Sequence, residues 1–281
     1  MQTTRLLDGS RCVTHITEVL GYEPEQKAAY MKALEQPQGM ILVTGPTGSG
    51  KTQTLYSMLE YLHQDHLNIC TIEDPVEITV PGINQTQTNE KIDLSFATVL
   101  RSLLRQDPDI IMLGEIRDQE TADIAIRAAQ TGHLVLTTLH TNNTYKTLHR
   151  LLNLGIEPYN LIDCINLIIA QRLVRTLCPH CKTALSEAEK KGIEETIQTP
   201  LYHHTLYRAT GCSQCTNGYH GREGVFEVTL PSDALNNTLL NIHQPVDTAS
   251  LVLQDLNSDG IKKLKQGRTC ITELRRVLTM D

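Results

Sequence analysis

The chain has 281 residues, of which 40% are apolar and 20% charged, and this length allows one large domain or two modest ones with a substantial core. Its formal net charge of −7 at pH 7 is opposite to the basic footprint of a duplex-binding protein, although a local basic patch is compatible with it. With two Phe, nine Tyr and no Trp, aromatic side chains are too few for base stacking to be the main working surface.

The sequence also lacks the signals of a membrane or exported protein. No apolar stretch reaches the length of a membrane span, and the N-terminus does not have the pattern of a secretory signal peptide. We therefore expect a cytoplasmic protein whose membrane association would come only through partners.

Residues 1–38 carry no motif that indicates chemistry. Within them we expect a short helix from Thr14 to Leu20 and a longer one from Pro24 to Leu34. A turn at residues 36–39 follows, because Pro and Gly interrupt regular structure there. This region is predicted to be a linker or the remnant of an N-terminal domain that leads to the first strand.

A phosphate-binding loop follows the apolar strand Met40–Val43 and precedes a helix expected from Gln53 to His63. The loop has the spacing G-x-x-x-x-G-K-T and consists of Gly45, Pro46, Thr47, Gly48, Ser49, Gly50, Lys51 and Thr52. Its glycines let successive N–H groups point at phosphate oxygens, and the following helix presents its positive end to the same anion. Lys51 would reach the β- and γ-phosphates, and the Thr52 hydroxyl would bind Mg²⁺. The alternative, a glycine-rich turn with a chance lysine, does not account for the flanking strand and helix.

The next strand, Asn68–Ile72, ends in three carboxylates: Glu73, Asp74 and Glu77. Parallel α/β sheets place their ligand sites at the carboxyl ends of strands, where these residues fall. One of them, with Glu73 preferred, would orient or deprotonate an attacking water. The alternative is a solvated acidic turn.

A second acidic strand end lies further along the chain. The helix expected from Leu94 to Leu104 carries Arg101, and Arg105 follows one turn later on the same face. The strand Ile110–Leu113 then leads into Gly114 and Glu115, where a nucleotide hydrolase has the carboxylate that holds Mg²⁺ directly or through water. Gly114 stands where Asp is common, so Glu115 supplies the acid. The alternative is an exposed glutamate at a strand end.

An alanine-rich helix, Thr121–Thr131, is expected before the strand His133–Thr141, which has a histidine near each end. At the carboxyl end His140 would sense the γ-phosphate, although an isolated histidine at a strand end is more often structural. Tyr145–Leu154 and Leu161–Leu173 are predicted to be further helices.

Of the eight cysteines, four form two C-x-x-C pairs separated by 30 residues: Cys178, Cys181, Cys212 and Cys215. Two such pairs at this distance fit tetrahedral Zn²⁺ with four thiolates, which leaves no position for water and indicates a structural site. A redox dithiol is the main alternative. The polar segment between the pairs, Ala184–Arg208, is predicted to be helical at its start and to form an insertion held at its base by the metal.

The remaining chain carries no catalytic constellation. Residues 217–228 are predicted to form a turn and a strand, and small helices are expected from Ser258 to Gln266 and from Ile271 to Leu278. The predicted organisation has four parts: residues 1–38 before the core, 39–176 as an α/β core, 177–216 as a zinc-binding subdomain, and 217–281 as a C-terminal strand with helices.

Together these motifs resemble the type II secretion and type IV pilus assembly ATPase family. The resemblance covers residues 38–281 in the family's order. Beside the second cysteine pair, it rests on GPTGSGKT at 45–52, TIEDPVE at 71–77, LRSLLRQDPDIIMLGEIRD at 100–118, TGHLVLTTLHTN at 131–142 and AQRLVRTLCPHC at 170–181.

The resemblance implies a RecA-like P-loop core, a homo-hexameric ring, and ATP hydrolysis coupled to extrusion of pilin or pseudopilin subunits with an inner-membrane platform protein. It places Glu73, the likeliest general base, with Asp74 and Glu77 in an aspartate box. It places Glu115 in the Walker B motif, and His133 and His140 in a histidine box. Arg101 and Arg105 match arginines that help complete the nucleotide site, in the same chain or across a subunit boundary.

The tetracysteine site points to the extension branch of this family, because the retraction ATPases usually lack it. The sequence of residues 167–182, LIIAQRLVRTLCPHCK, favours pilus assembly over type II secretion. Family members carry one or two domains before the P-loop domain, so we expect either an excised portion or a short member, with weak hydrolysis on its own. Such a motor would work at the cytoplasmic face of the inner membrane.

Two other classes of function compete with this interpretation. RecA-like ATPases include nucleic-acid translocases and helicases, and zinc ribbons often contact nucleic acid, but the acidic charge and scarce aromatics oppose direct nucleic-acid binding. A subunit that binds nucleotide without hydrolysing it, and serves as a scaffold, is the third possibility.

Overall fold

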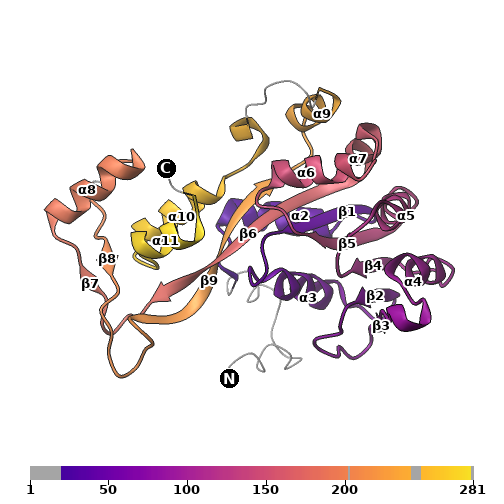
Figure 1. Ribbon diagram of the computed structural model, residues 1–281, viewed down its shortest axis with the longest axis horizontal. Coiled ribbons are helices and arrows are strands. Elements are labelled where there is room, and N and C mark those ends of the chain that lie inside the picture. Colours follow the sequence, from indigo (N-terminus) through magenta and orange to yellow (C-terminus); the bar gives the residue numbers. More distant parts are fainter. Residues whose placement is uncertain (1–19, 202, 242–247, 280–281) are drawn as a thin grey trace.

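A seven-stranded sheet lies at the centre of the molecule in a computed structural model that describes residues 20–201, 203–241 and 248–279 (Figure 1). The strand order is β3-β2-β4-β5-β1-β6-β9; the first six strands are parallel and β9 runs antiparallel to β6. The strands are β1 (Gly39–Thr44), β2 (Ile69–Glu73), β3 (Asn84–Gln87), β4 (Ile110–Leu113), β5 (Leu134–Leu139), β6 (Ile165–Leu177) and β9 (Tyr219–Thr229).

The central strands are mostly apolar because helices cover both faces of the sheet. In β1, Met40 and Leu42 pack into the core on one face, whereas Ile41 and Val43 pack into the core on the other. β1, β4 and β5 are buried along their whole length. A continuous apolar run is therefore what this position in the sheet requires.

The helices divide between the two faces of the sheet. Helices α4 to α7 and α9 pack on the first face, and α2 and α3 pack on the second. The helices are α2 (Pro24–Leu34), α3 (Lys51–Leu62), α4 (Phe96–Leu103), α5 (Gln119–Gln130), α6 (Thr144–Asn153), α7 (Pro158–Cys164), α8 (Glu187–Ile197), α9 (Asp233–Leu240), α10 (Leu256–Lys265) and α11 (Ile271–Val277), with 3₁₀ turns at Glu90–Ile92 and Thr248–Leu251. Side-chain caps at Ser95, Asp118 and Asn143 begin three of the helices on the first face.

The helix predicted from Leu161 to Leu173 is wrong beyond Cys164. Helix α7 ends at Cys164, and the chain continues directly into the 13-residue strand β6. The run from Ile165 onward is rich in β-branched residues, and between β1 and β9 it is buried on both faces over residues 167–171. A fully buried strand has no alternating pattern, so periodicity did not separate it from a buried helix.

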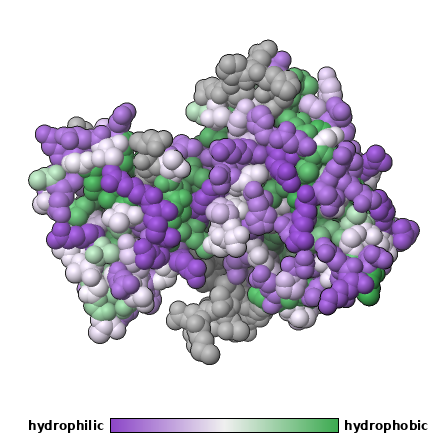
Figure 2. Space-filling view, in the orientation of Figure 1, coloured by the Kyte–Doolittle hydropathy of each residue, from purple (hydrophilic) through white to green (hydrophobic). Residues whose placement is uncertain are grey.

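A small lobe extends from the far end of β6 and β9 (Figure 1, left). It contains α8 and the short pair β7 (Thr183–Ala184) and β8 (Tyr207–Arg208). Its apolar side chains, among them Ile193 and Leu206, share a third core with Leu264 of α10 and Leu274 of α11. The face seen in Figure 2 is mostly hydrophilic, with apolar residues in scattered places.

The other expected elements of the core are confirmed, with small differences at their ends. The short helix expected from Thr14 to Leu20 lies, except for Leu20, outside the described residues. Strand β9, expected in the C-terminal part, pairs along β6, so the main sheet extends beyond residue 176. In the part of the chain that the structure describes, no helix is long and apolar enough to cross a membrane.

Candidate active site

The phosphate-binding loop opens into a cleft of about 590 Å³ at the carboxyl ends of the parallel strands. The cleft brings together residues from the loop, from β2, β4 and β5, and from β6 and β9. Gly50, the N-cap of α3, has φ +90°, a left-handed conformation that favours glycine. The cleft is lined by Thr47, Gly48, Gly50, Lys51, Thr52, Gln53, Leu55, Tyr56, Glu73, Asp74, Pro75, Glu77, Ile78, Phe96, Met112, Gly114, Glu115, Thr138, His140, Leu173 and Arg222.

Lys51 curls back over its own loop. Its Nζ donates hydrogen bonds to the carbonyl oxygens of Gly45 (2.9 Å) and Pro46 (3.3 Å). Burial lowers the pKa of Lys51, and the nearby Glu115 carboxylate opposes that effect. Thr52 is exposed on the cleft at the start of α3. The two residues expected to meet phosphate and Mg²⁺ therefore face the same opening.

Glu73 is a buried carboxylate held by uncharged donors. Its Oε2 accepts a hydrogen bond from the Tyr56 hydroxyl (2.5 Å). Its Oε1 accepts from Thr71 (2.7 Å) and from the amide of Gln85 on β3 (3.0 Å). The side chain is 4% exposed, yet it forms part of the cleft wall. These contacts fix the orientation of the carboxylate.

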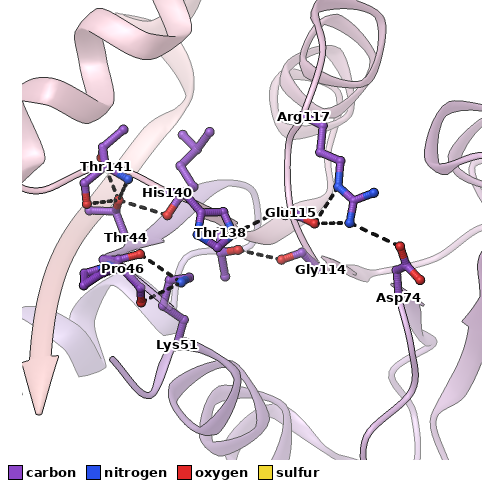
Figure 3. A network of polar contacts seen from close by, with 12 residues as sticks. Thr44, Pro46, Lys51, Asp74, Gly114, Glu115, Arg117, Thr138, His140 and Thr141 are labelled. Carbon is purple, nitrogen blue, oxygen red and sulfur yellow. Dashed lines mark hydrogen bonds and ion pairs between the residues drawn. The ribbon is translucent and has the colours of Figure 1, made fainter. Parts of the chain in front are cut away.

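A chain of ionisable side chains crosses the other side of the cleft (Figure 3). His140 Nε2 lies 3.0 Å from Glu115 Oε2, and Arg117 Nε donates to Glu115 Oε1 at 2.6 Å. Arg117 Nη2 also donates to Asp74 Oδ2 (3.2 Å), so one guanidinium links the acids after β2 and β4. The hydrogen bond with Glu115 raises the pKa of Arg117, and the guanidinium stays charged.

Threonine hydroxyls tie the strand ends of this site together. Thr44, at the end of β1, contacts the Thr141 hydroxyl at 2.6 Å and accepts a hydrogen bond from the Thr141 N–H at 3.0 Å. Thr138 on β5 donates to the Gly114 carbonyl at 2.7 Å. The position of His140 is thereby coupled to the start of the phosphate-binding loop and to the Glu115 segment.

The two arginines and the first histidine of the predicted motifs lie away from the cleft. Arg101 forms an exposed ion pair with Glu120 at 2.5 Å, and Arg105 donates to the Arg101 carbonyl at 2.9 Å. His133 lies at the opposite end of β5, where Nδ1 is 3.0 Å from the Ala128 carbonyl oxygen. Within one chain, the structure does not bring either arginine to the phosphate-binding loop.

Arg222, on β9, lines the cleft although it belongs to none of the predicted motifs. Its side chain is exposed and makes no hydrogen bond or ion pair with the described residues. Leu173 of β6 lies beside it on the cleft wall. Both reach the site because the paired strands β6 and β9 pass beside the phosphate-binding loop. No local signal in the sequence places residue 222 near residue 50.

The four cysteines of the C-x-x-C pairs converge at the base of the small lobe. Their sulfur atoms all lie within 4.8 Å of one another, and three of the separations are 3.6 to 4.0 Å. A tetrahedral ion with Zn–S bonds of about 2.3 Å places its sulfurs about 3.8 Å apart. The backbone N–H of Gly211 donates to Cys181 Sγ at 3.3 Å, a contact suited to a thiolate. The donor set and its geometry fit zinc.

A parallel sheet with a phosphate-binding loop after β1 and acids after β2 and β4 defines a P-loop nucleotide-binding protein. The family model described as type II/IV secretion system protein matches residues 3–276, and the chain belongs to this family. The pilus retraction motor PilT, solved with bound ADP, superposes with a TM-score of 0.70 at 31% identity over 93% of this chain and 66% of that one. These findings confirm the family and the RecA-like fold that the motifs predicted.

Curated relatives give the same assignment. The chain is 48% identical over 282 residues to the type IV pilus assembly ATPase PilB of Acinetobacter baylyi, covering 97% of this chain and 48% of that protein. It is 43% identical over 267 residues to the type II secretion system ATPase E of Vibrio cholerae, covering 92% of this chain and 52% of that protein. The chain thus spans about half the length of these relatives.

Proposed function

We propose that this chain is the ATP-hydrolysing part of a motor that assembles type IV pili or type II secretion pseudopili. The observation that carries the proposal is one cleft in which the loop Gly45–Thr52 faces two strand-end carboxylates, Glu73 and Glu115. The likeness to PilT, which was solved with ADP, supports a nucleotide as the ligand. The higher identity to assembly ATPases than to this retraction motor supports the assembly branch.

Each group in the cleft then has a role. Loop N–H groups and Lys51 bind the phosphates, while Thr52 and Glu115 hold Mg²⁺ and its water shell. Glu73 positions and deprotonates the attacking water. His140 senses whether the γ-phosphate is present through its contact with Glu115. Mg²⁺ supplies charge neutralisation when bound, and the protein provides the geometry around it.

The cleft also indicates what one chain lacks. Among the described residues that line it, Lys51 and Arg222 are the only lysine and arginine, and the nearby Arg117 is held by Glu115 and Asp74. We propose that Arg101 and Arg105, exposed on α4 and just after it, act on the cleft of a neighbouring chain in a homo-hexameric ring. Such a ring would work at the cytoplasmic face of the inner membrane, bound to a platform protein. Zn²⁺ held by Cys178, Cys181, Cys212 and Cys215 would fix the base of the small lobe.

Nucleotide binding tests this proposal directly. We expect the wild-type chain to bind ATP more tightly with Mg²⁺ than without it, and Lys51→Ala to weaken binding at least about tenfold because the phosphates lose a charge-assisted partner. The matched control is Lys191→Ala, which removes an exposed lysine on α8 and should leave affinity unchanged. Calorimetric titration measures all three. Equal affinity in wild type and Lys51→Ala would contradict the site.

A further inference from the structure

Gln171 is a buried polar residue in the most apolar part of β6. It is 2% exposed and follows directly after the buried residues Leu167–Ala170. A primary amide at such a position is costly unless its donor and its acceptor are both satisfied. From its contacts we infer that Gln171 is a positioning residue for the phosphate-binding loop, an inference that rests on the nucleotide site proposed above.

Both ends of the Gln171 amide are used, and both partners belong to the loop and the helix after it. Nε2 donates a hydrogen bond to the Ser49 carbonyl at 2.8 Å. Oε1 accepts one from the Thr54 hydroxyl at 2.8 Å. Because the Ser49 carbonyl can only accept, it requires the Nε2 end of the amide to face it, and Oε1 then faces the Thr54 hydroxyl. One buried side chain bridges the last residue before Gly50 and the first turn of α3.

The direction of the Ser49 carbonyl matters for phosphate binding. A loop that cradles phosphate must present its N–H groups inward, so its carbonyl groups must point outward and find other partners. Gln171 supplies that partner for Ser49, which is itself 3% exposed and out of reach of bulk water. Without the amide, the buried carbonyl has no donor and the peptide group beside Gly50 is free to turn.

The backbone of the same residue holds the other end of the loop. A Cβ at Gly45 would lie 2.6 Å from the Gln171 carbonyl oxygen, so the strand abuts the loop there and only glycine fits. Arg172 Nη1 donates to this carbonyl at 3.0 Å, and its Nη2 donates to the Asn142 carbonyl at 2.8 Å. Gln171 thus contacts both ends of the loop without lining the cleft, and acts on the nucleotide only through the loop.

Mg·ADP affinity tests the inference in three variants. We expect Gln171→Ala to weaken binding about tenfold, the order of one lost buried hydrogen bond. Thr54→Val removes the hydroxyl that donates to Gln171 Oε1 while keeping the side-chain shape, and should weaken binding by a smaller factor, because the hydrogen bond to Ser49 remains. Gln171→Glu keeps the acceptor but loses the donor at neutral pH. Its affinity relative to wild type should recover as the pH falls, because a protonated carboxyl can donate to Ser49.

Gln26→Ala is the matched control. Gln26 is 0% exposed and also bridges backbone groups, donating to the Phe226 carbonyl and accepting from the Glu23 N–H, but it does not contact the loop. Gln26→Ala should lower the melting temperature, measured in the absence of nucleotide, by about as much as Gln171→Ala does. Its Mg·ADP affinity should stay within about twofold of the wild-type value.

The outcomes separate this inference from the proposed function. If wild type binds Mg·ADP and Lys51→Ala does not, but all Gln171 and Thr54 variants bind like Gln26→Ala, only the positioning role is overturned. If wild type does not bind Mg·ADP, or Lys51→Ala binds it equally well, the proposed nucleotide site fails as well. If Gln171→Ala does not fold, the positioning role is tested by the Mg·ADP affinity of Thr54→Val and by the pH dependence of the Mg·ADP affinity of Gln171→Glu.

Discussion

Glu73 and Glu115 end neighbouring strands, but their carboxylates are held in different ways. Glu73 is bound by the neutral donors of Tyr56, Thr71 and Gln85, and no cation among the described residues forms an ion pair with it. Glu115 contacts Arg117 and His140, both of which can carry positive charge. A carboxylate of fixed orientation held by neutral donors suits a base, whereas one that contacts Arg117 and His140 can exchange these contacts for Mg²⁺ and its water.

We expect Glu73→Gln to reduce phosphate release from ATP by about 100-fold or more, because the amide cannot take a proton from water. ATP affinity should remain close to that of the wild type, since no phosphate contact is lost. Steady-state phosphate release and equilibrium binding measure the two effects separately. Glu77→Gln is the matched control, because Glu77 lines the same cleft and is exposed. Loss of turnover in Glu77→Gln but not in Glu73→Gln would assign the base to Glu77.

The sequence predicted the site residues that lie inside short motifs, but not those that reach the site from distant segments of the chain. The phosphate-binding loop, Glu73 and Glu115 follow their strands directly, so local sequence predicts that they share one edge of the sheet. Gln171 reaches that edge because β6 pairs with β1, which lies more than 100 residues earlier in the chain, and Arg222 reaches it because β9 pairs with β6. Arg117 lies within a motif, but its link to Asp74 depends on the pairing of β2 with β4.

At the scale of elements, the long strand β6 connects the two ends of the molecule. It pairs with β1 at the phosphate-binding loop. Its last residue, Leu177, is followed directly by Cys178, the first cysteine of the small lobe. The sequence predicted a helix over Leu161–Leu173 because burial on both faces removes the alternation that marks a strand. Strand β3 and helix α9 were also not predicted, whereas the strands that lead into the phosphate-binding loop, Glu73 and Glu115 were correctly placed.

A buried carboxylate, Glu273, joins helix α11 to β6 beside their apolar contact. Glu273 is 0% exposed and accepts hydrogen bonds from the Arg175 N–H (2.9 Å), Arg175 Nη2 (2.6 Å) and Arg276 Nη2 (2.7 Å). Burial acts to raise its pKa, but the hydrogen bonds from Arg276 and Arg175 lower it from 4.5 to about 2. The folded state therefore favours the charged form, and this stabilisation is present above about pH 4.5 and lost as pH falls towards 2.

We expect Glu273→Gln to lower the free energy of unfolding at pH 7 by roughly 2 to 3 kcal/mol. The difference from wild type should shrink between pH 4.5 and pH 2, because the wild-type carboxyl becomes protonated in that range. Urea unfolding followed by circular dichroism at several pH values measures it. Glu195→Gln, at an exposed position on α8, should show no such pH dependence. A difference that stays constant down to pH 2 would contradict the role of charge.

At the scale of the whole molecule, the small lobe has little apolar core of its own. Helix α8 buries a single side chain, Ile193, and the lobe's other apolar residues rely on α10 and α11. Four cysteine sulfurs within 4.8 Å close its base. A structural metal is the usual way to stabilise so small a unit.

We expect a single zinc ion per chain by elemental analysis, and Cys212→Ser to abolish it by leaving three thiolates. Metal loss should lower the melting temperature and expose α8 to protease, while Mg·ATP affinity changes little because the cleft lies on the main sheet. The control is Cys164→Ser at a buried cysteine outside the cluster, which should keep its zinc. Metal-free protein with an intact small lobe would contradict the zinc assignment.

The cleft and the two exposed arginines make a prediction about assembly. Arg101 and Arg105 lie on the outer surface near α4 rather than at the phosphates of their own chain. Catalysis by a charge supplied from a neighbouring chain gains orders of magnitude in rate. Turnover per chain should therefore depend on how many chains are assembled.

The direct test is the specific ATPase rate over a range of protein concentrations, with the mass measured by light scattering on the same samples. We expect the rate per chain to rise as 31.4 kDa single chains give way to hexamers, and Arg101→Ala to suppress that rise without changing Mg·ADP affinity. A rate per chain that is the same for single chains and assemblies, or an absence of turnover in hexamers, would contradict a motor whose site is completed by its neighbour.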